Sequence, residues 1–322
     1  MNNETILKYL SETEYISGQR LADILGVSRQ TVWKAVNALR NSGYIIETVP
    51  HKGYRIKEYP RRLCAAAVKS LLKTQVIGKN FIELDEVGST NDLLKRLGSE
   101  GCPNGTVAAA HSQTNGKGRL GRVWESERDR GLAFSILLRP KLMPAQTSAV
   151  TPLTGLAVCK ALRSFTGIDC KIKWPNDVIA GNRKVAGILT EMSAEFDAVE
   201  YIVTGIGVNA EQTVFPEEIA FKATSLLLES GRLCDQNRLI SCILEHIEKT
   251  LMQSGMELSQ PLLKEYTDLC VTVGRNVSFV RGARRMSGMA VGVSESGELK
   301  VMLSDGSIIN INSGEVTVQG IY

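Results

Sequence analysis

Several features that would place a protein in a class at first sight are missing from this chain of 322 residues. The first residues lack the basic and apolar regions of a secretion signal, and no uninterrupted apolar run of about 18 residues predicts a transmembrane helix. The seven cysteines are scattered, with no C-x-x-C pair, which argues against a disulfide framework and a zinc site. The three histidines stand apart from one another, so we expect no metal centre. These absences indicate a cytoplasmic protein without a membrane segment.

The composition has little bias of any kind. Hydrophobic residues make up 43% of the chain and charged residues 22%, which is ordinary globular usage and excludes a disordered or collagen-like chain. Lysine and arginine outnumber aspartate and glutamate by only 38 to 34, so the net charge alone does not identify a nucleic-acid-binding protein. The length suggests about two domains, or a large domain with a small one attached. Evidence of function must therefore come from local motifs.

Residues 1–60 predict a winged helix-turn-helix domain. Residues 21–25 carry one short apolar face, and residues 32–39 carry a second one at helical spacing. Between them Gly26 permits a tight turn and Ser28 is a suitable N-cap for the second helix. Residues 44–56 then predict a hairpin, the wing. The polar and basic residues of the second helix that we expect to enter a DNA major groove are Ser28, Arg29, Gln30, Thr31 and Lys34.

Residues 64–270 mix helices and strands and are expected to form a central domain, after a linker at residues 60–62. The pattern predicts helices over residues 65–72, 90–97, 148–165 and 237–252, and strands over residues 132–138, 185–192 and 201–208. The helix at 90–97 is expected to begin with a Ser89-Thr90-Asn91 cap.

Residues 271–322 change to short strands separated by turn residues, including the turn Asn312-Ser313-Gly314-Glu315. Four or five antiparallel strands in so short a segment suggest a small barrel. We therefore expect an α+β protein of three domains.

The strongest local signal is the glycine-rich, basic segment at residues 116–124. Its first seven residues contain three glycines and three cations, which suits a loop that binds an anion through backbone amides and side-chain charges. It is not a P-loop, because no Gly-Lys-Ser/Thr end follows and no strong strand is predicted before it, and its glycine spacing does not fit a dinucleotide fingerprint. Trp124 offers a plane on which a base or a hydrocarbon ring can stack. The alternative is a flexible basic surface loop.

Three further segments have two interpretations each. Pro175 fixes the backbone where Asn176 and Asp177 project, although Pro-Asn-Asp is also good turn chemistry. Lys184 stands at the mouth of an apolar strand, where its charge can point into a pocket or into solvent. The glycines of residues 205–209 allow either a close backbone approach or a bulge. His111, in the same region, is interpreted as a partly buried strand histidine with no part in the chemistry.

Together these segments resemble the biotin protein ligases. The loop Gly116-Lys117-Gly118-Arg119-Leu120-Gly121-Arg122-Val123-Trp124 is followed about 50 residues later by Lys173-Trp174-Pro175-Asn176-Asp177, an order and spacing typical of that family. The domain in front and the β-rich tail match the bifunctional bacterial type, which is both ligase and repressor. One departure is Lys117, which stands where some members carry arginine and lacks the planar fork of that side chain.

The resemblance implies an ATP-dependent biotin–[acetyl-CoA-carboxylase] ligase with a class II synthetase-like central domain and an SH3-like C-terminal barrel. Biotin and ATP, with Mg²⁺, would give biotinyl-5′-AMP, and biotin would then pass to a lysine of a biotin carboxyl carrier protein. The resemblance assigns biotin binding to Ser89, Thr90, Asn91, Gln113, Lys117, Gly118, Arg119 and Lys184, and adenylate binding to Arg122, Trp124, Asn176 and Asn209. Lys184 and Arg119 are expected to be catalytic, because two anions must be brought together. It further implies a homodimer that forms on binding of biotinyl-AMP and represses biotin genes at an operator DNA.

Three rival interpretations stay open. A repressor that has lost catalysis predicts damage to the cationic loop or to Lys184, and both are intact. A lipoate ligase-like enzyme would share the fold, but residues 173–177 and the N-terminal domain favour biotin. A ligase with a protein-binding N-terminal module predicts acidic or apolar residues on the groove-facing side of the second helix, where Ser28, Arg29, Gln30, Thr31 and Lys34 are polar or basic.

Overall fold

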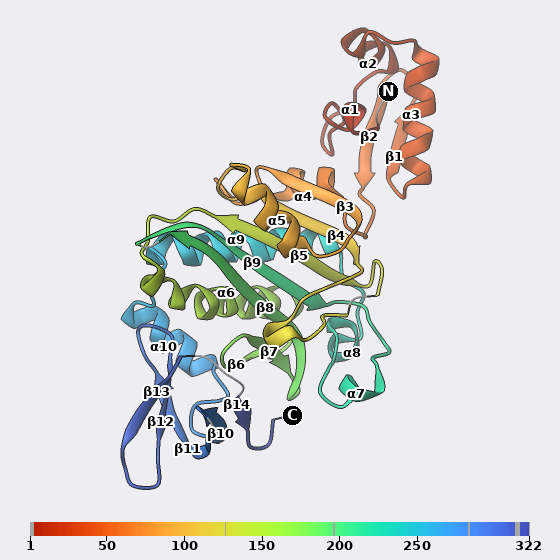
Figure 1. Cartoon of the computed structure of the whole chain (residues 1–322). Helices are drawn as coiled ribbons and strands as arrows, with labels where there is room; N and C mark the ends of the chain where they lie inside the picture. Colours follow the sequence, from red (N-terminus) through yellow and green to blue (C-terminus); the bar gives the residue numbers. More distant parts are fainter. Residues whose placement is uncertain (1–2, 126, 196, 283, 313–315, 322) are drawn as a thin grey trace.

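The computed structural model describes residues 3–125, 127–195, 197–282, 284–312 and 316–321. Three parts follow one another in space as they do along the chain: a small N-terminal domain, a central sheet with its helices, and a C-terminal β domain at the far end (Figure 1). No described helix is long and apolar enough to cross a bilayer.

The N-terminal part is a winged helix-turn-helix domain, as predicted. The N-cap Ser28 accepts a hydrogen bond from the Thr31 N–H at 3.1 Å, and Gly26 takes the left-handed conformation of a tight turn, with φ 62°. The buried apolar residues between Ile6 and Ile56 form a core of their own. The elements are α1 (Asn3–Leu7), α2 (Gly18–Leu25), α3 (Arg29–Asn41), β1 (Ile45–Val49) and β2 (Gly53–Glu58).

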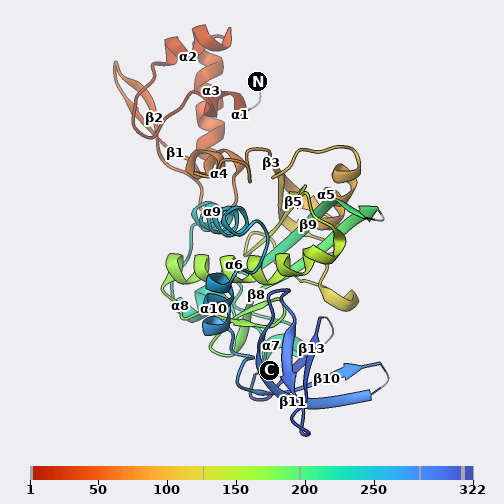
Figure 2. The ribbon, with the colours of Figure 1, turned by 90° about the vertical axis from the view of Figure 1, so that its left-hand side faces the viewer.

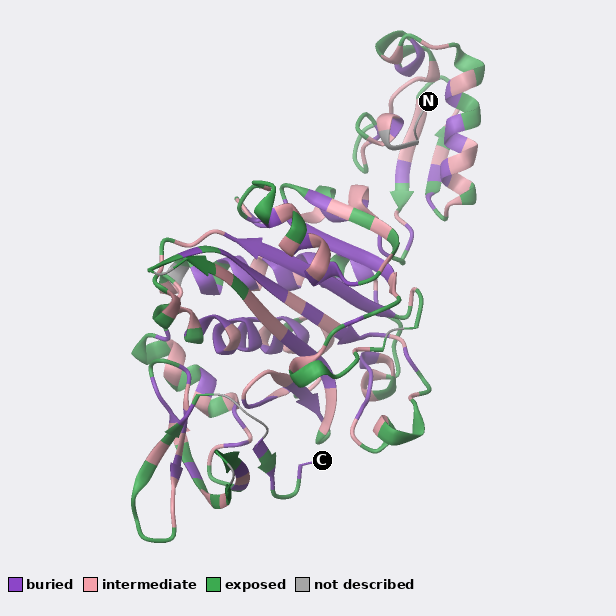
Figure 3. Ribbon diagram, in the orientation of Figure 1, coloured by how far each residue is buried: buried purple, intermediate pink, exposed green. Residues whose placement is uncertain are grey.

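The central part is built on a seven-stranded sheet with the order β3-β4-β5-β9-β8-β7-β6. Only β3 and β4 run parallel, and all other neighbours are antiparallel. The inner strand β5 is buried along its whole length, which explains its unbroken run of apolar and small residues (Figure 3). The strands are β3 (Phe81–Val87), β4 (Val107–Gln113), β5 (Gly131–Leu138), β6 (Lys171–Lys173), β7 (Asp177–Ala180), β8 (Arg183–Glu195) and β9 (Ala198–Asn209).

Helices cover both faces of this sheet (Figure 2). On one face lie α6 (Val150–Thr166), whose buried residues run along most of its length, and α9 (Gln236–Ser254), with α4 (Ala65–Leu71) packed against α9. On the other face α5 (Thr90–Ser99) packs against β4, β5 and β9. The remaining helical segments are η1 (Arg119–Gly121), η2 (Pro144–Ala149), α7 (Glu217–Ala220), α8 (Leu226–Ser230) and α10 (Gln260–Leu269).

Two local predictions for the central part need comment. Ser89 stands at the N-cap of α5, as predicted, but its side chain makes no capping bond; the Thr90 N–H donates to Oε1 of Gln113 at 2.8 Å. The expectation that no strong strand comes before the glycine-rich segment is wrong. A strand does precede the glycine-rich segment, because β4 ends at Gln113, three residues before Gly116. Its Val-Ala-Ala-Ala-His sequence is poor in β-branched residues, and burial between β3 and β5 outweighs that low propensity.

The C-terminal part is a five-stranded antiparallel sheet with the order β13-β12-β11-β10-β14. Its strands are β10 (Asn276–Arg281), β11 (Arg284–Val293), β12 (Leu299–Met302), β13 (Ile308–Ile311) and β14 (Val316–Val318). The edge strands β13 and β14 do not pair with each other in the described ranges, so the SH3-like barrel is not confirmed and no closed barrel is seen. The predicted turn at residues 312–315 lies largely outside the described residues, since 313–315 are not among them.

The C-terminal sheet shares its core with the central part. The indole N–H of Trp174, a residue 2% exposed, donates to the Gly297 carbonyl at 2.9 Å, and the Trp174 N–H donates to Oγ1 of Thr272 at 3.1 Å. Their buried apolar residues form one continuous cluster, whereas the N-terminal core stands apart. The boundary proposed at residue 271 thus separates two sheets but not two hydrophobic cores.

Candidate functional site

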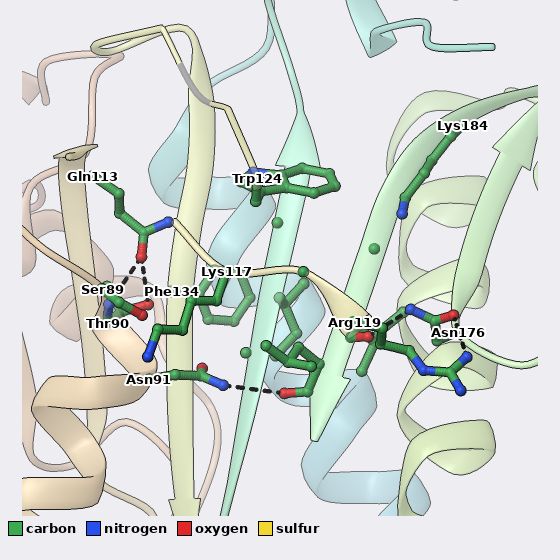
Figure 4. A pocket seen from close by; sticks show the side chains of 17 residues that line it. Ser89, Thr90, Asn91, Gln113, Lys117, Arg119, Trp124, Phe134, Asn176 and Lys184 are labelled. Atoms are coloured by element: carbon green, nitrogen blue, oxygen red, sulfur yellow. Dashed lines mark hydrogen bonds between the residues drawn. The ribbon is translucent and has the colours of Figure 1, made fainter. Parts of the chain in front are cut away.

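A narrow cavity of about 50 Å³ lies where the start of α5, the end of β4, the glycine-rich segment and the middle of β8 and β9 meet (Figure 4). These segments are far apart in the sequence and come together because β4, β5, β9 and β8 are neighbours in the sheet. The cavity gathers ten of the predicted site residues: Ser89, Thr90, Asn91, Gln113, Lys117, Gly118, Arg119, Trp124, Asn176 and Lys184.

One wall of this cavity is a buried polar network. The hydroxyls of Thr90 and Ser135 lie 2.7 Å apart, and the Ser135 hydroxyl donates to Oδ1 of Asn91 at 2.6 Å. The Asn91 amide donates to Oε2 of Glu191 at 2.7 Å. Gln113 accepts from Thr90 through Oε1, which leaves its own N–H₂ group toward the cavity (Figure 4). Such a network fixes donors and acceptors in place before any ligand arrives.

Two glycines let other side chains approach the β9 backbone. A Cβ atom at Gly205 would lie 2.3 Å from Oδ1 of Asn91, and one at Gly207 would lie 2.3 Å from the Trp124 ring. Both glycines pair in regular register with β5 and β8, so the bulge interpretation is wrong and the close approach is confirmed. The floor of the cavity is therefore formed by the β9 backbone. A flat ligand could lie on this floor, between the side chains that surround it.

The glycine-rich segment folds back on itself above this floor. The Gly118 N–H donates to the Arg122 carbonyl at 2.7 Å, and the Trp124 N–H donates to the Gly116 carbonyl at 2.9 Å. The turn between them takes left-handed conformations at Leu120 and Gly121, with φ 57° and 73°. Side chains from both ends of the segment line the cavity.

Cations surround the cavity, each with a polar partner. Nζ of Lys184 lies 2.6 Å from Oδ1 of Asp177 and 5.3 Å from the centre of the Trp124 ring. The Arg119 guanidinium donates to Oδ1 of Asn176 at 3.1 Å, and Lys117 pairs with Asp92 at 2.7 Å. Burial is the main cause that lowers the pKa of Arg119. A buried cation is stabilised by an incoming anion, so this arrangement favours a negatively charged ligand.

A second, wider cavity of about 700 Å³ adjoins the first and shares Gly118, Arg119, Trp124, Asn176 and Lys184 with it. Arg122 and Asn209 line only this wider cavity, and the Asn209 amide also donates to the Thr224 carbonyl at 2.9 Å. Several of its lining residues were not predicted as site residues: Asp177, Phe215, Phe221, Lys222, Val316 and Thr317. Asp177 belongs to the motif of residues 173–177. The other residues lie in segments whose sequence carries no functional motif, and only the tertiary structure brings them to the cavity.

His111 has the structural role expected of it. It is 9% exposed on β4, with Nδ1 at 2.5 Å from Asp129 and Nε2 at 3.0 Å from Glu83. The hydrogen bond with Glu83 is the largest cause that raises the pKa of His111; Asp129 adds to it and burial opposes it. His111 lines neither of the two cavities described above.

The predicted DNA-binding residues lie on α3, at the opposite end of the molecule from the C-terminal sheet (Figure 1). Arg29, Gln30 and Lys34 are exposed, whereas Ser28 and Thr31 bond to each other through their hydroxyls at 2.9 Å in the cap. Among the residues that the structure describes, no group of three or more His, Cys, Asp or Glu side chains could hold a metal ion.

Comparison with known proteins agrees with this architecture. Residues 84–209 match the Biotin/lipoate A/B protein ligase family, residues 2–55 match an HTH domain, and residues 272–318 match the Biotin protein ligase C terminal domain. The chain is 36% identical over 295 residues to the Bifunctional ligase/repressor BirA of Bacillus subtilis, covering 91% of each chain. It is 30% identical to the protein of that name from Escherichia coli, covering 98% of this chain and 96% of that one.

A solved structure is also similar to three quarters of the chain. The biotin protein ligase from Aquifex aeolicus, in complex with biotin and ATP, matches with a TM-score of 0.65 and 33% sequence identity, over 75% of this chain and 99% of that one. The relatives that carry both the N-terminal and the ligase parts match nearly end to end. The chain therefore belongs to the biotin protein ligase family, in the branch of bifunctional ligase/repressor proteins.

Proposed function

We propose that this protein is an ATP-dependent biotin protein ligase that is also a repressor controlled by its own reaction intermediate. The observation that carries the proposal is the narrow cavity, with its hydrogen-bonding wall at one end and Arg119 and Lys184 at the other. Biotin combines a polar ureido ring with an anionic tail. The ring would lie against Ser89, Thr90, Asn91 and Gln113, with its carboxylate toward the cations.

The wider cavity would take ATP, whose α-phosphate then meets the biotin carboxylate at the residues shared by both cavities. A carboxylate oxygen attacks this phosphorus, the bond to the β-phosphate breaks, and pyrophosphate leaves. Lys184 and Arg119 would stabilise the negative charge that builds up there. Lys117 and Gly118 would help to hold biotin, while Arg122, Trp124, Asn176 and Asn209 would hold the adenylate.

A lysine amine of a biotin carboxyl carrier protein would then attack the carbonyl carbon of biotinyl-5′-AMP. The C–N bond forms, AMP leaves with the anhydride oxygen, and the amine loses a proton. We further propose that Mg²⁺ arrives with ATP, bound by phosphates and water, because the Asp177 carboxylate is already paired with Lys184. This chemistry needs no oxidising compartment, and the protein would work in the cytoplasm.

For repression, α3 would enter the major groove of operator DNA. One winged helix makes few contacts, so two copies related by a two-fold axis would bind, and biotinyl-5′-AMP would favour that dimer. The central test incubates the protein with biotin, ATP, Mg²⁺ and a carrier domain. Label on the carrier supports the ligase proposal, and absence of label contradicts it.

The repressor half has its own test. DNA from upstream of the biotin synthesis genes is titrated with and without biotin plus ATP, while sedimentation follows the mass of the protein. We expect tighter, salt-sensitive DNA binding and a doubled mass with both ligands. The double variant Arg29→Ala/Lys34→Ala should lose DNA binding and keep carrier labelling. Equal DNA affinity in all conditions would contradict ligand control.

A further inference from the structure

One large apolar side chain on α3 is more than half exposed in the described part of the chain. Trp33 is 55% exposed, and its indole N–H makes no hydrogen bond to a described residue. The other two tryptophans have clear environments, since Trp124 lines the two cavities and Trp174 is buried under the C-terminal sheet. An exposed tryptophan is costly in water, so what covers Trp33 matters.

Its surroundings on the helix are basic and polar. Trp33 follows Arg29 by one turn, and Gln30 and Lys34 are exposed beside it. The sequence of α3 contains no aspartate or glutamate, and Arg40 is tied to the wing through the Ile46 carbonyl and Thr48. The buried face of α3 is formed by other residues, chiefly Val32, Val36 and Leu39. Trp33 therefore belongs to a cationic surface and not to the packing of its own domain.

The described part of the chain leaves more than half of the Trp33 side chain uncovered. In Figure 1 α3 forms an outer edge of the N-terminal domain, away from the central sheet, and Figure 3 shows exposed residues along that edge. A second copy of the same face would oppose the charges of Arg29 and Lys34 with like charges. A polyanion with apolar groups between its charges fits better, and the DNA major groove has both.

We propose that Trp33 determines part of the DNA sequence preference by packing its indole ring against the 5-methyl group of a thymine. Thymine carries the only methyl group among the base edges of the major groove, and apolar side chains recognise it by contact. Arg29 and Lys34 would hold the phosphates on either side, and Gln30 would reach a base edge. This inference rests on the proposed repressor function and adds the chemistry by which one base is selected.

The experiment uses the full-length chain with biotin, ATP and a pool of DNA duplexes randomised over the binding site. Wild type, Trp33→Ala and Trp33→Phe each select their preferred sequence from the pool. We expect Trp33→Ala to lose the preference at a thymine position and to bind the wild-type consensus roughly 10- to 100-fold more weakly. Trp33→Phe should keep part of the preference. Arg29→Ala is the matched control and should weaken binding to all duplexes alike, with a smaller salt dependence.

A second measurement isolates the methyl group. Each thymine of the consensus duplex is replaced in turn by uracil, which removes only that methyl. At one position in each half-site the change should weaken wild-type binding about fourfold, the loss expected for one buried methyl, and should leave Trp33→Ala binding unchanged. The proposal is overturned if Trp33→Ala selects the wild-type consensus, or if the uracil duplexes affect both proteins equally.

Failure of the repressor proposal itself looks different. In that case wild type would enrich no sequence from the pool, and the inference on Trp33 would fall with it. Adenylate formation by Trp33→Ala serves as the folding control, because the N-terminal domain that carries Trp33 has a core separate from that of the ligase cavities. We expect that rate to equal the wild-type rate.

Discussion

The two cavities of the central domain share one wall and differ in almost every other respect. The narrow cavity is walled by Thr90 and Asn91, both 3% exposed, and by a β-strand backbone that Asn91 and Trp124 approach closely at Gly205 and Gly207. The wider cavity includes the exposed apolar side chains of Val214, at 80%, and Phe221, at 68%. The narrow cavity is thus preorganised, whereas the wide one needs a ligand to cover its apolar surface.

This difference implies different tolerances to substitution. A preorganised cavity loses function when a single atom is added or a single charge is removed, since its neighbours are fixed by packing and hydrogen bonds. A wide cavity with exposed walls can adjust. The same kind of substitution should therefore have a large effect in the narrow cavity and a small one in the wide cavity.

The largest effect is expected for Lys184→Ala, at the wall shared by both cavities. Removing a group that stabilises transition-state charge commonly lowers a rate by ~10²–10³, and Lys184 is 2.6 Å from Asp177, which would be left without this cation. We expect adenylate formation from biotin and ATP, measured as pyrophosphate release, to fall by that factor. Lys222→Ala removes the same charge from the wide cavity only and should cost less than about fivefold. Similar rate losses in both variants would contradict the difference in substitution tolerance that we expect between the two cavities.

The next largest effect is expected for Gly205→Ala in the floor of the narrow cavity. The added methyl would meet Oδ1 of Asn91 at 2.3 Å and push that side chain from Ser135 and Glu191. Overpacking of this kind costs about 1–3 kcal/mol, so biotin affinity measured by calorimetry should fall roughly 10- to 100-fold. Gly292→Ala, in the C-terminal sheet with open space around the new methyl, is the control and should bind biotin normally. Unchanged affinity in Gly205→Ala would mean that the floor is not preorganised.

A smaller effect, on stability, is expected for His111→Leu. The change removes the imidazole that lies between the Glu83 and Asp129 carboxylates. Because both carboxylates are partly exposed, we expect the free energy of unfolding, measured in urea, to fall by about 1–3 kcal/mol. The folded-state pKa of His111 is raised, so its stabilising contribution is complete below the unfolded-state pKa of about 6.5 and disappears as the pH rises through the folded-state value.

The difference between wild type and His111→Leu should therefore be largest in mildly acidic solution and shrink in alkaline solution. Glu83→Gln keeps the shape of the side chain and removes one of the two charges beside His111. The stability difference between wild type and this variant should therefore change with pH in the same direction, but less strongly. A difference that stays constant with pH would mean that the pKa of His111 is the same in the folded and the unfolded protein, which would contradict this prediction.

The narrow cavity was also the more predictable of the two from sequence. Its residues stand in short segments, so Lys117 and Asn176 could be singled out from the local pattern and Gln113 from the family resemblance. The wide cavity is lined by Phe215, Phe221 and Val316, apolar residues from a loop and from an edge strand of another sheet. Only the tertiary arrangement joins them, and no local pattern marks an apolar residue as part of a binding wall.

For secondary structure too, elements with a clear local pattern were predictable and elements that depend on tertiary contacts were not. The long helix α6 and the strands β5, β8 and β9 were predicted because their apolar patterns are unambiguous. Strand β3 was not predicted, although its acidic and apolar residues nearly alternate, and β4 was not expected to be a strong strand because it is rich in alanine. Their pairing with each other and with β5 provides what local propensity lacks. Ser89 does stand at the N-cap of α5, but its side chain makes no capping bond.

The smallest effect is expected for Phe221→Ala in the wide cavity. Phe221 is 68% exposed and lies under the Lys222 ammonium, so its removal opens no hole in the core and should hardly change stability. If an adenine or ribose covers it, the variant loses part of that apolar contact and the KM for ATP should rise about two- to fivefold, with biotin affinity unchanged. Steady-state kinetics with biotin at saturation measure this. A large fall in the maximal rate, of the size expected for Lys184→Ala, would show instead that the wide cavity is as rigid as the narrow one, and that its exposed side chains are part of the reacting geometry.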